Sequence, residues 1–273
     1  MFDRIFLQRY MPGDRALKVI EDEGFYFRRI DGYPDDPTEG DRKFFGKQEQ
    51  TIVDSLNARL PAGAQATSAE AKTLAYDAMH REKKGVFIQS WFWHKDMSRF
   101  MWDSYGGYSR NTDCVLFVVN LFKLGEFLDN ALPIGYRFQP VEYIQDKQAQ
   151  REALFTKQDK FAPEREYRIS INIGELIFFN RQILAEFNWP SRNVEVHRED
   201  DLSINFRNRG VAREDIFRYV DDFGFILKAP LPDLLEAVYI PSNASSKFCS
   251  QLDELLASKG HSIRCKRIDL PAA

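Results

Sequence analysis

Runs of β-branched and aromatic residues are scattered among helical stretches, without the regular strand–helix–strand spacing of a doubly wound sheet. Strands are expected most clearly over 25–29, 85–93, 114–120 and 164–173. The run at 114–120 is continuously apolar, which is typical of a strand buried on both faces, whereas 164–173 alternates like a half-buried strand. This irregular order favours an α+β fold: a single domain over 1–273 with a central mixed or antiparallel sheet flanked by helices.

Helices and shorter strands fill much of the remaining chain. Capping residues and apolar periodicity predict helices over 15–23, 43–60, 69–83, 96–105, 145–155 and 245–258. Shorter strands are expected over 141–144, 237–240 and 262–268. The stretch between 178 and 225 mixes strand and loop signals, and it contains a locally basic run from Arg207 to Arg218.

Composition bounds the class of protein. Hydrophobic residues make up 44% and charged residues 29% of the chain, so a sizeable core is expected and global disorder is not. The net charge is −3, which does not favour a general nucleic-acid binder. Three widely spaced cysteines, Cys114, Cys249 and Cys265, match neither a disulfide framework nor metal-ligand spacing. No apolar run approaches the ~18 residues of a membrane span, so a cytoplasmic protein without a membrane partner is expected.

The clearest chemical signal is a pair of carboxylates, Glu164 and Glu166, on the predicted strand 164–173. Side chains at i and i+2 share one face of a strand, and two carboxylates placed there repel and raise the pKa of one of them. Such a pair suits acid–base work or the stabilisation of a cation. Lys157 and Arg168 lie near it in sequence. The structural alternative is an exposed strand face carrying Glu–Arg pairs, which is the commoner meaning of so short a motif.

An acidic loop supports a different hypothesis about the function of the protein. Asp36 and Glu39 lie in a turn-like segment, and with Glu164 and Glu166 they could supply the oxygen ligands of a metal-dependent nuclease. The simpler interpretation of that loop is a turn. No glycine-rich phosphate loop or dinucleotide fingerprint occurs in the chain. A third interpretation is a non-enzymatic nucleotide- or protein-binding module.

The order of several motifs resembles a known bacterial family. The segments that carry the resemblance are Arg9-Tyr10, Ile88-Gln89-Ser90-Trp91, Met101-Trp102-Asp103-Ser104-Tyr105-Gly106, Val141-Glu142-Tyr143 and Glu164-Arg165-Glu166-Tyr167-Arg168. In this order they are similar to the family catalogued as domain of unknown function 2971, over nearly the whole chain. The family's loop usually reads Phe-Asn-Asp-Pro-Phe-Glu, whereas the segment from Tyr33 to Glu39 lacks the Asn. The family name carries no activity.

The succession of an early Arg, a Ser on an aromatic strand and a late Glu-x-Glu also resembles the Arg–Ser–Glu pattern of ADP-ribosyltransferases. That resemblance implies that Arg9 contacts the phosphate or ribose of NAD and that Ser90 shapes the nicotinamide pocket. It makes Glu166 the carboxylate that binds ribose and stabilises an oxocarbenium-like state, with Glu164 orienting or activating the nucleophile.

The same resemblance implies further binding residues and a fold of the ADP-ribosyltransferase type. The aromatic candidates for stacking on nicotinamide are Tyr10, Trp91, Trp102 and Tyr105, and the cationic candidates are Lys157 and Arg168. For Trp102, core packing is the commoner alternative. NAD is expected as the substrate, without a metal, and the expected partners are a small-molecule nucleotide and a protein or nucleic-acid target. By analogy, the biological role is that of a toxin or an anti-phage defence effector.

Overall fold

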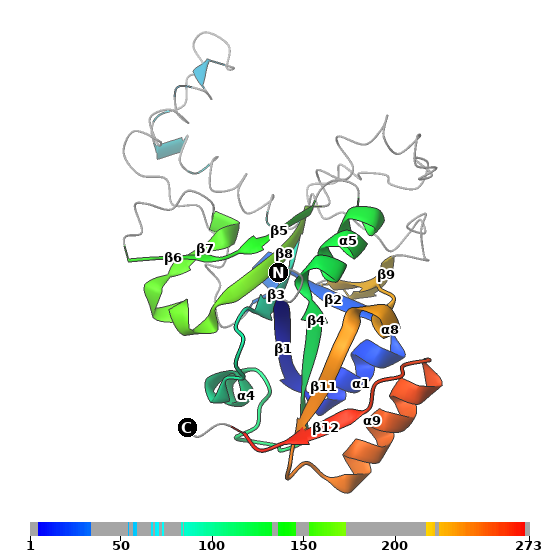
Figure 1. The fold of residues 1–273 in the computed structure, drawn as a ribbon. Coiled ribbons are helices and arrows are strands. Elements are labelled where there is room, and N and C mark those ends of the chain that lie inside the picture. The colour runs from blue at the N-terminus through cyan, green and yellow to red at the C-terminus, as the bar shows by residue number, and fades with distance from the viewer. Residues whose placement is uncertain are drawn as a thin grey trace.

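The computed structural model describes residues 5–33, 85–132, 136–145, 153–172, 217–221 and 224–270, together with isolated positions between 54 and 83. Within these residues the protein is α+β: a ten-stranded, largely antiparallel sheet carries helices on its faces (Figure 1). The predicted fold class is confirmed. Apart from the isolated positions, the helices expected at 43–60 and 69–83 lie outside the described residues. None of the described helices is long and apolar enough to cross a membrane.

The elements follow one another irregularly along the chain. The main sheet contains β1 (Phe6–Pro12), β2 (Gly24–Arg29), β3 (Val86–Phe92), β4 (Cys114–Asn120), β5 (Tyr136–Pro140), β8 (Glu166–Asn172), β9 (Phe217–Asp221), β10 (Gly224–Lys228), β11 (Leu235–Pro241) and β12 (Cys265–Ile268). The helices are α1 (Gly13–Glu21), α4 (Arg99–Ser104), α5 (Leu121–Ala131), α8 (Leu231–Leu234) and α9 (Ser246–Ser258). A small separate sheet pairs β6 (Glu142–Ile144) with β7 (Thr156–Gln158), and the 3-10 helices are η1 (Ile30–Gly32), η3 (Ala153–Phe155) and η4 (Asp159–Glu164).

Strand β3 is the branch point of the main sheet. One of its edges pairs with β8 along the whole strand. Its other edge is shared, because β2 pairs with it at Phe87 and Ile88 whereas β1 pairs with it at Phe92. The sheet therefore divides into two arms, β1–β4–β11–β12 and β2–β10–β9, which leave β3 in different directions in Figure 1. We call residues 89–91 of β3, which lie between these two pairings, the fork.

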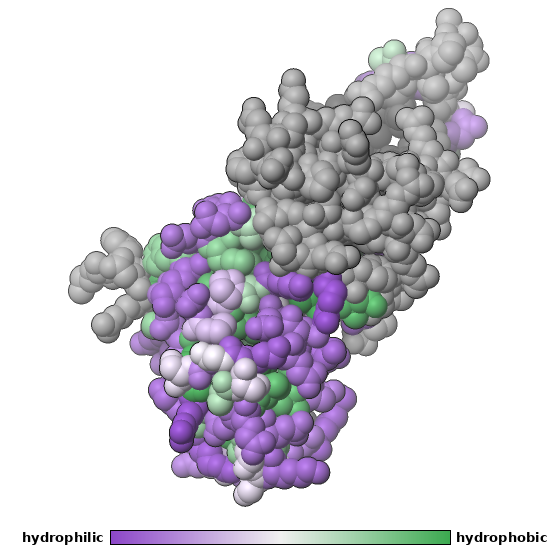
Figure 2. All heavy atoms as spheres, turned by 90° about the vertical axis from the view of Figure 1, so that its right-hand side faces the viewer, coloured by the Kyte–Doolittle hydropathy of each residue, from purple (hydrophilic) through white to green (hydrophobic). Residues whose placement is uncertain are grey.

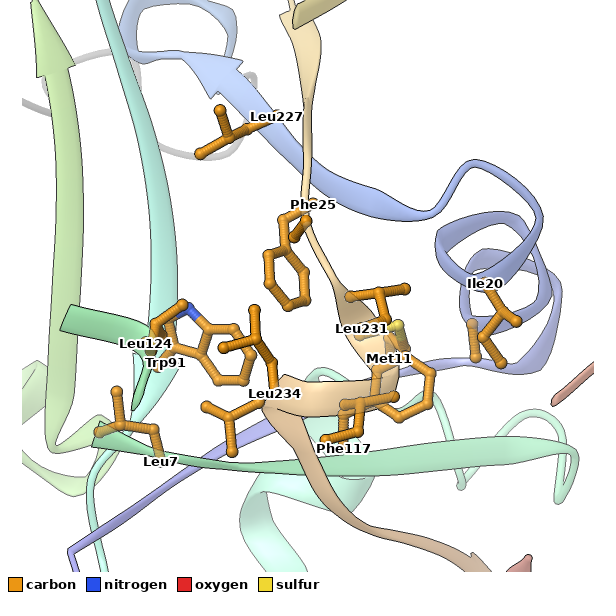
Figure 3. Packing of buried hydrophobic residues seen from close by; sticks show 14 of the residues in the cluster. Leu7, Met11, Ile20, Phe25, Trp91, Phe117, Leu124, Leu227, Leu231 and Leu234 are labelled. Carbon is orange, nitrogen blue, oxygen red and sulfur yellow. The ribbon is translucent and has the colours of Figure 1, made fainter. Parts of the chain in front are cut away.

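The main hydrophobic core fills the space between the two arms. Figure 3 shows side chains from both arms and from the helices converging there, with Phe25 of β2 facing Trp91 of β3. Their ring centroids lie 5.4 Å apart in a T-shaped arrangement. Burial of so many large side chains is the main source of stability, at roughly 1.5–3 kcal/mol for each fully buried aliphatic or aromatic residue.

Alternation along β3 assigns its side chains to two faces. Phe87 and Trp91 belong to the main core, whereas Ile88 and Phe92 belong to two smaller clusters on the opposite face. Trp102 of α4 completes the cluster around Phe92. The second face is the one on which polar and charged side chains gather at the fork.

Most predicted strands are confirmed within one or two residues, and the departures have local causes. The helix expected from residue 96 begins at Arg99, because the Ser98 side chain accepts a hydrogen bond from the Met101 N–H and so caps the helix there. Sequence reasoning did not assign α5, whose capping residue is Asn120, the last residue of β4. It also did not assign β5. Of the helix expected over 145–155, the structure describes residue 145 and residues 153–155. Residues 153–155 form the 3-10 helix η3.

Candidate functional site

A cluster of polar and charged side chains lies on the second face of β3, beside the fork. Ser90 of β3 is paired with Arg168 of β8, and Phe92 is paired with Glu166. Directly opposed residues of an antiparallel pair project to the same face, so Ser90, Glu166 and Arg168 share one surface. Lys157 of β7 reaches the same place. Two segments 76 residues apart thus meet through side chains that sequence reasoning had selected.

Glu166 is the centre of the cluster, and its side chain is 4% exposed. Its Oε1 atom accepts hydrogen bonds from the Ser90 hydroxyl and, at 2.6 Å, from Arg168 Nε, while Oε2 lies 2.8 Å from Lys157 Nζ. Burial by itself would raise the pKa of Glu166, but the charges of Arg168 and Lys157 outweigh it and lower the pKa to about 2. Glu166 is therefore ionised at neutral pH.

Glu164 reaches the cluster by a route that the sequence did not indicate. It was expected on the same strand face as Glu166, but it is the last residue of η4. Arg165, which follows, adopts a left-handed conformation with φ of 41°, and β8 begins only at Glu166. The two carboxylates are joined because Lys157 Nζ lies 2.9 Å from Glu164 Oε2 as well as contacting Glu166. Repulsion between the two carboxylates was expected to raise the pKa of one of them. That expectation is wrong for Glu166, whose pKa is lowered.

Ser90 connects this buried network to solvent. It is the exposed residue of β3, and its neighbours on that strand are buried. It lies in the fork, where the second edge of β3 passes from β2 to β1. A group that binds at the Ser90 hydroxyl is therefore one hydrogen bond away from the Glu166 carboxylate.

The structure does not bring Arg9 to this cluster. Gln8 is paired with Phe92, so the next residue, Arg9, projects to the opposite face of the sheet, together with Trp91. Its guanidinium carbon lies 5.7 Å from the centroid of the Trp91 ring. Burial lowers the pKa of Arg9 to about 10, and among the residues that the structure describes its buried Nη1 atom has no hydrogen-bond partner. The contact that the resemblance implied between Arg9 and a ligand beside Glu166 has no support in this geometry.

Three of the four aromatic candidates are core residues. Tyr10, Trp91 and Trp102 are 5%, 2% and 0% exposed, and edge-on contacts with other rings hold them. They offer no free ring face to a ligand, so the structure does not place them as stacking residues. Tyr105 is different: it is 45% exposed, and its hydroxyl donates a 2.7 Å hydrogen bond to Glu164 Oε1. Burial and the Glu164 contact raise the pKa of Tyr105.

Two further groups hold the cluster in place, and sequence reasoning did not select them. The Tyr143 hydroxyl accepts a 2.8 Å hydrogen bond from the Glu166 N–H, and the Leu154 carbonyl accepts a 2.5 Å hydrogen bond from Arg168 Nη1. Tyr143 is paired with Lys157 in the small β6–β7 sheet, which brings both residues beside β8. The Val-Glu-Tyr strand was part of the family resemblance, and this was the one signal that could have identified Tyr143.

Of the four ligands expected for a metal-dependent nuclease, the structure describes Glu164 and Glu166. Asp36 and Glu39 lie outside the described residues. In the part of the chain that the structure describes, no group of three His, Cys, Asp or Glu residues is arranged to hold an ion. An ammonium, that of Lys157, occupies the place between Glu164 and Glu166 where a shared cation would bind. Fully buried Arg168 and partly exposed Lys157 are the cations of this site.

The fold and the site define an α+β protein with a forked sheet, in which a buried, ion-paired glutamate lies behind an exposed serine. No family model, curated protein or solved structure matches this chain. The resemblance to family 2971 and the resemblance to ADP-ribosyltransferases both stay predictions from the sequence.

Proposed function

We propose that this protein is an NAD-consuming enzyme of the ADP-ribosyltransferase type, with Glu166 as its catalytic carboxylate. The observation that carries the proposal is the hydrogen bond from exposed Ser90 to buried, ionised Glu166 at the fork of the sheet. An exposed serine and a fixed carboxylate behind it fit the cleavage of a glycosidic bond to ribose.

The proposed chemistry depends on the charge of Glu166. When the bond between nicotinamide and ribose breaks, positive charge develops at the anomeric carbon, and a pre-positioned carboxylate stabilises that charge. The pKa of Glu166, lowered to about 2, keeps it ionised throughout the neutral range. The Ser90 hydroxyl and Arg168 both bind Oε1, so they fix the orientation of the carboxylate and leave Lys157 on Oε2.

The other members of the cluster receive roles that match their exposure. Tyr105 presents a partly exposed ring beside Glu164, on which a nicotinamide or adenine base can stack. Glu164 orients or activates the acceptor. Lys157, with its side chain 14% exposed, takes the phosphate contact that the resemblance had assigned to Arg9. Because Lys157 bridges both carboxylates, its movement toward a phosphate would free Glu166 Oε2 for a ribose hydroxyl.

A second candidate, a non-enzymatic nucleotide- or protein-binding module, is favoured by one observation. Both oxygens of Glu166 already contact cationic side chains of the protein itself. In that case the cluster would be a structural ion network, and the exposed groups, Ser90 and Tyr105, would contact a ligand without chemistry.

The test is incubation with NAD, with nicotinamide release followed for the wild type and for Glu166→Gln. We expect the wild type to release nicotinamide and the variant to be slower by about 10²- to 10³-fold, the usual cost of losing one key electrostatic group. Asp113→Asn is the matched control, because Asp113 also accepts a long-range hydrogen bond from a serine, Ser245, at 2.8 Å. It lies on the loop before β4 and should retain activity.

A folded variant at an exposed position keeps the test decisive. Ser90→Ala removes a hydroxyl from an exposed residue and should lower the rate while thermal melting stays close to that of the wild type. Wild-type protein that releases no nicotinamide, or a folded Glu166→Gln that is as fast as the wild type, would refute the proposal. The binding module would then be favoured if NAD still bound and Ser90→Ala weakened that binding.

A further inference from the structure

Two cysteines lie on neighbouring elements, Cys249 on α9 and Cys265 on β12, and the charge of Cys249 is one of the causes that raise the pKa of Cys265. Cys249 and Asp253 are four residues apart on α9, so they lie on one side of that helix. Cys265 and Arg267 are two residues apart on β12 and share one face of that strand. Both cysteines are partly buried against the main hydrophobic core, which places both side chains on the inner side of their elements.

Two cross-contacts join these faces. Arg267 Nη2 lies 2.9 Å from Cys249 Sγ, and the Cys265 N–H donates a 2.8 Å hydrogen bond to Asp253 Oδ1. Arg267 is held in position because its Nη1 atom also donates to the carbonyls of Ser242 and Ala244, at 2.7 and 3.0 Å. The two cysteines are therefore diagonal neighbours, each beside the charged partner of the other.

We propose that Cys249 and Cys265 form a thiol pair that hydrogen peroxide converts into a reversible intramolecular disulfide, fastening α9 to β12. The arrangement combines a sulfur in contact with a guanidinium, a second thiol beside a carboxylate, and partial exposure of the first sulfur. Reactive cysteines occur in electropositive, partly exposed surroundings of this kind. Figure 2 shows the side of the molecule on which α9 lies in Figure 1, and its described part is mainly hydrophilic.

The chemistry balances with one equivalent of peroxide. Cys249 sulfur attacks a peroxide oxygen, the O–O bond breaks, and water leaves, which gives a sulfenic acid. Arg267 stabilises the negative charge on the attacking sulfur. Burial raises the pKa of the Cys265 thiol, and a hydrogen bond to Asp253 raises it further. The Cys265 thiol therefore needs a base. Asp253 accepts its proton while Cys265 sulfur displaces the sulfenic oxygen as a second water. Two thiols lose two electrons, and the peroxide gains them.

Cys114 provides an internal control. It is fully buried on β4, where its sulfur donates to the Thr112 carbonyl and burial, with the nearby Asp113 charge, raises its pKa to about 12. A thiol in that environment should not react while the protein is folded.

The experiment treats the folded, full-length chain with hydrogen peroxide, blocks remaining thiols and maps peptides by mass spectrometry without reduction. We expect a cross-linked peptide containing Cys249 and Cys265 that disappears on treatment with a dithiol, and an unmodified Cys114. Cys249→Ser should abolish the cross-link, and Arg267→Gln should slow its formation severalfold. The oxidised wild type should also melt at a higher temperature than the reduced protein, because the cross-link restricts the unfolded chain.

Other outcomes overturn the proposal. Both cysteines could be recovered free after peroxide, or each could be oxidised separately to a sulfinic acid. A disulfide between two chains, or one that includes Cys114, would contradict the assigned geometry. If Cys249→Ser does not fold, the melting temperatures of the oxidised and reduced wild type decide: equal values refute the intramolecular link.

Discussion

The charge state of Glu166 makes the stability of the protein sensitive to acid. Folding lowers the pKa of Glu166 from its usual value of 4.5 to about 2. Because one pKa unit corresponds to about 1.4 kcal/mol, ionised Glu166 contributes about 3 kcal/mol to the free energy of unfolding at neutral pH. The unfolded chain takes up the proton first, so this contribution is complete above the unfolded pKa and is lost as pH falls toward the folded pKa. About 2 kcal/mol of it is gone by pH 3.

Glu166→Gln isolates this effect, because the amide has nearly the same shape and no titration. The variant lacks the contribution at every pH and also leaves the Arg168 guanidinium without its carboxylate. It should therefore be less stable than the wild type by about 3 kcal/mol at pH 7, the range in which removing one partner of a buried pair falls. The difference should shrink by about 2 kcal/mol at pH 3, because Glu166 in the unfolded wild-type chain is largely protonated at that pH.

The assay is urea unfolding of both proteins at pH 7, 5, 4 and 3, chosen over guanidinium because urea does not screen charges. Ser90→Ala is the control, since it keeps Glu166 and both cations that lower its pKa. Its stability should follow the wild-type dependence on pH. A difference between wild type and Glu166→Gln that stays constant or widens toward pH 3 would show that Glu166 is not held ionised by Arg168 and Lys157.

Three further predictions concern packing, titration and capping elsewhere in the fold. Gly24→Ala should lower the free energy of unfolding by about 1–3 kcal/mol in the same denaturant assay, because the new Cβ would lie 2.5 Å from the Leu227 carbonyl oxygen. Gly125→Ala should raise it by roughly 0.5–1 kcal/mol, because Gly125 lies inside a helix and the nearest atom to its new Cβ is 3.7 Å away. Burial lowers the pKa of His261 below 6.5, so the wild type should lose stability as pH falls from 7.5 to 5.5, and thermal melts of His261→Leu should show a smaller loss. Ser245→Ala removes the cap of α9 and should lower the free energy of unfolding by about 0.5–2 kcal/mol in the same denaturant assay.

Local patterns in the sequence were sufficient for much of the fold. The apolar run 114–120 and the aromatic run around Trp91 became β4 and β3 because each pattern reports directly on burial. The C-terminal helix could be placed because Ser245 caps it and apolar residues recur along one side. Ser90 and Glu166 could be selected as candidates, but their contact depends on the register of β3 against β8, which no local pattern encodes.

The site residues that the sequence misplaced have different physical reasons. A shift of one residue along a strand moves a side chain to the other face of the sheet, so Arg9 and its neighbour Gln8 project to opposite sides. Tyr10 and Trp102 are aromatic, and burial of their large rings dominates over any polar role. Glu164 departs from the strand because Arg165 adopts a left-handed conformation, a rare choice for a residue that is not glycine.

The position of the cluster argues for a role beyond stability. On the second face of β3, Ser90 lies between Ile88 and Phe92, both buried in apolar clusters. Apolar residues at the positions of Glu166 and Arg168 would extend that apolar layer, and replacing a buried ion pair in this way is often neutral or stabilising. An apolar pair at these two positions could therefore stabilise the fold as well as the charges do. They lie, however, directly behind the exposed residue of the strand, where the sheet divides, and we propose that the fixed negative charge of Glu166 acts there on a molecule bound at Ser90.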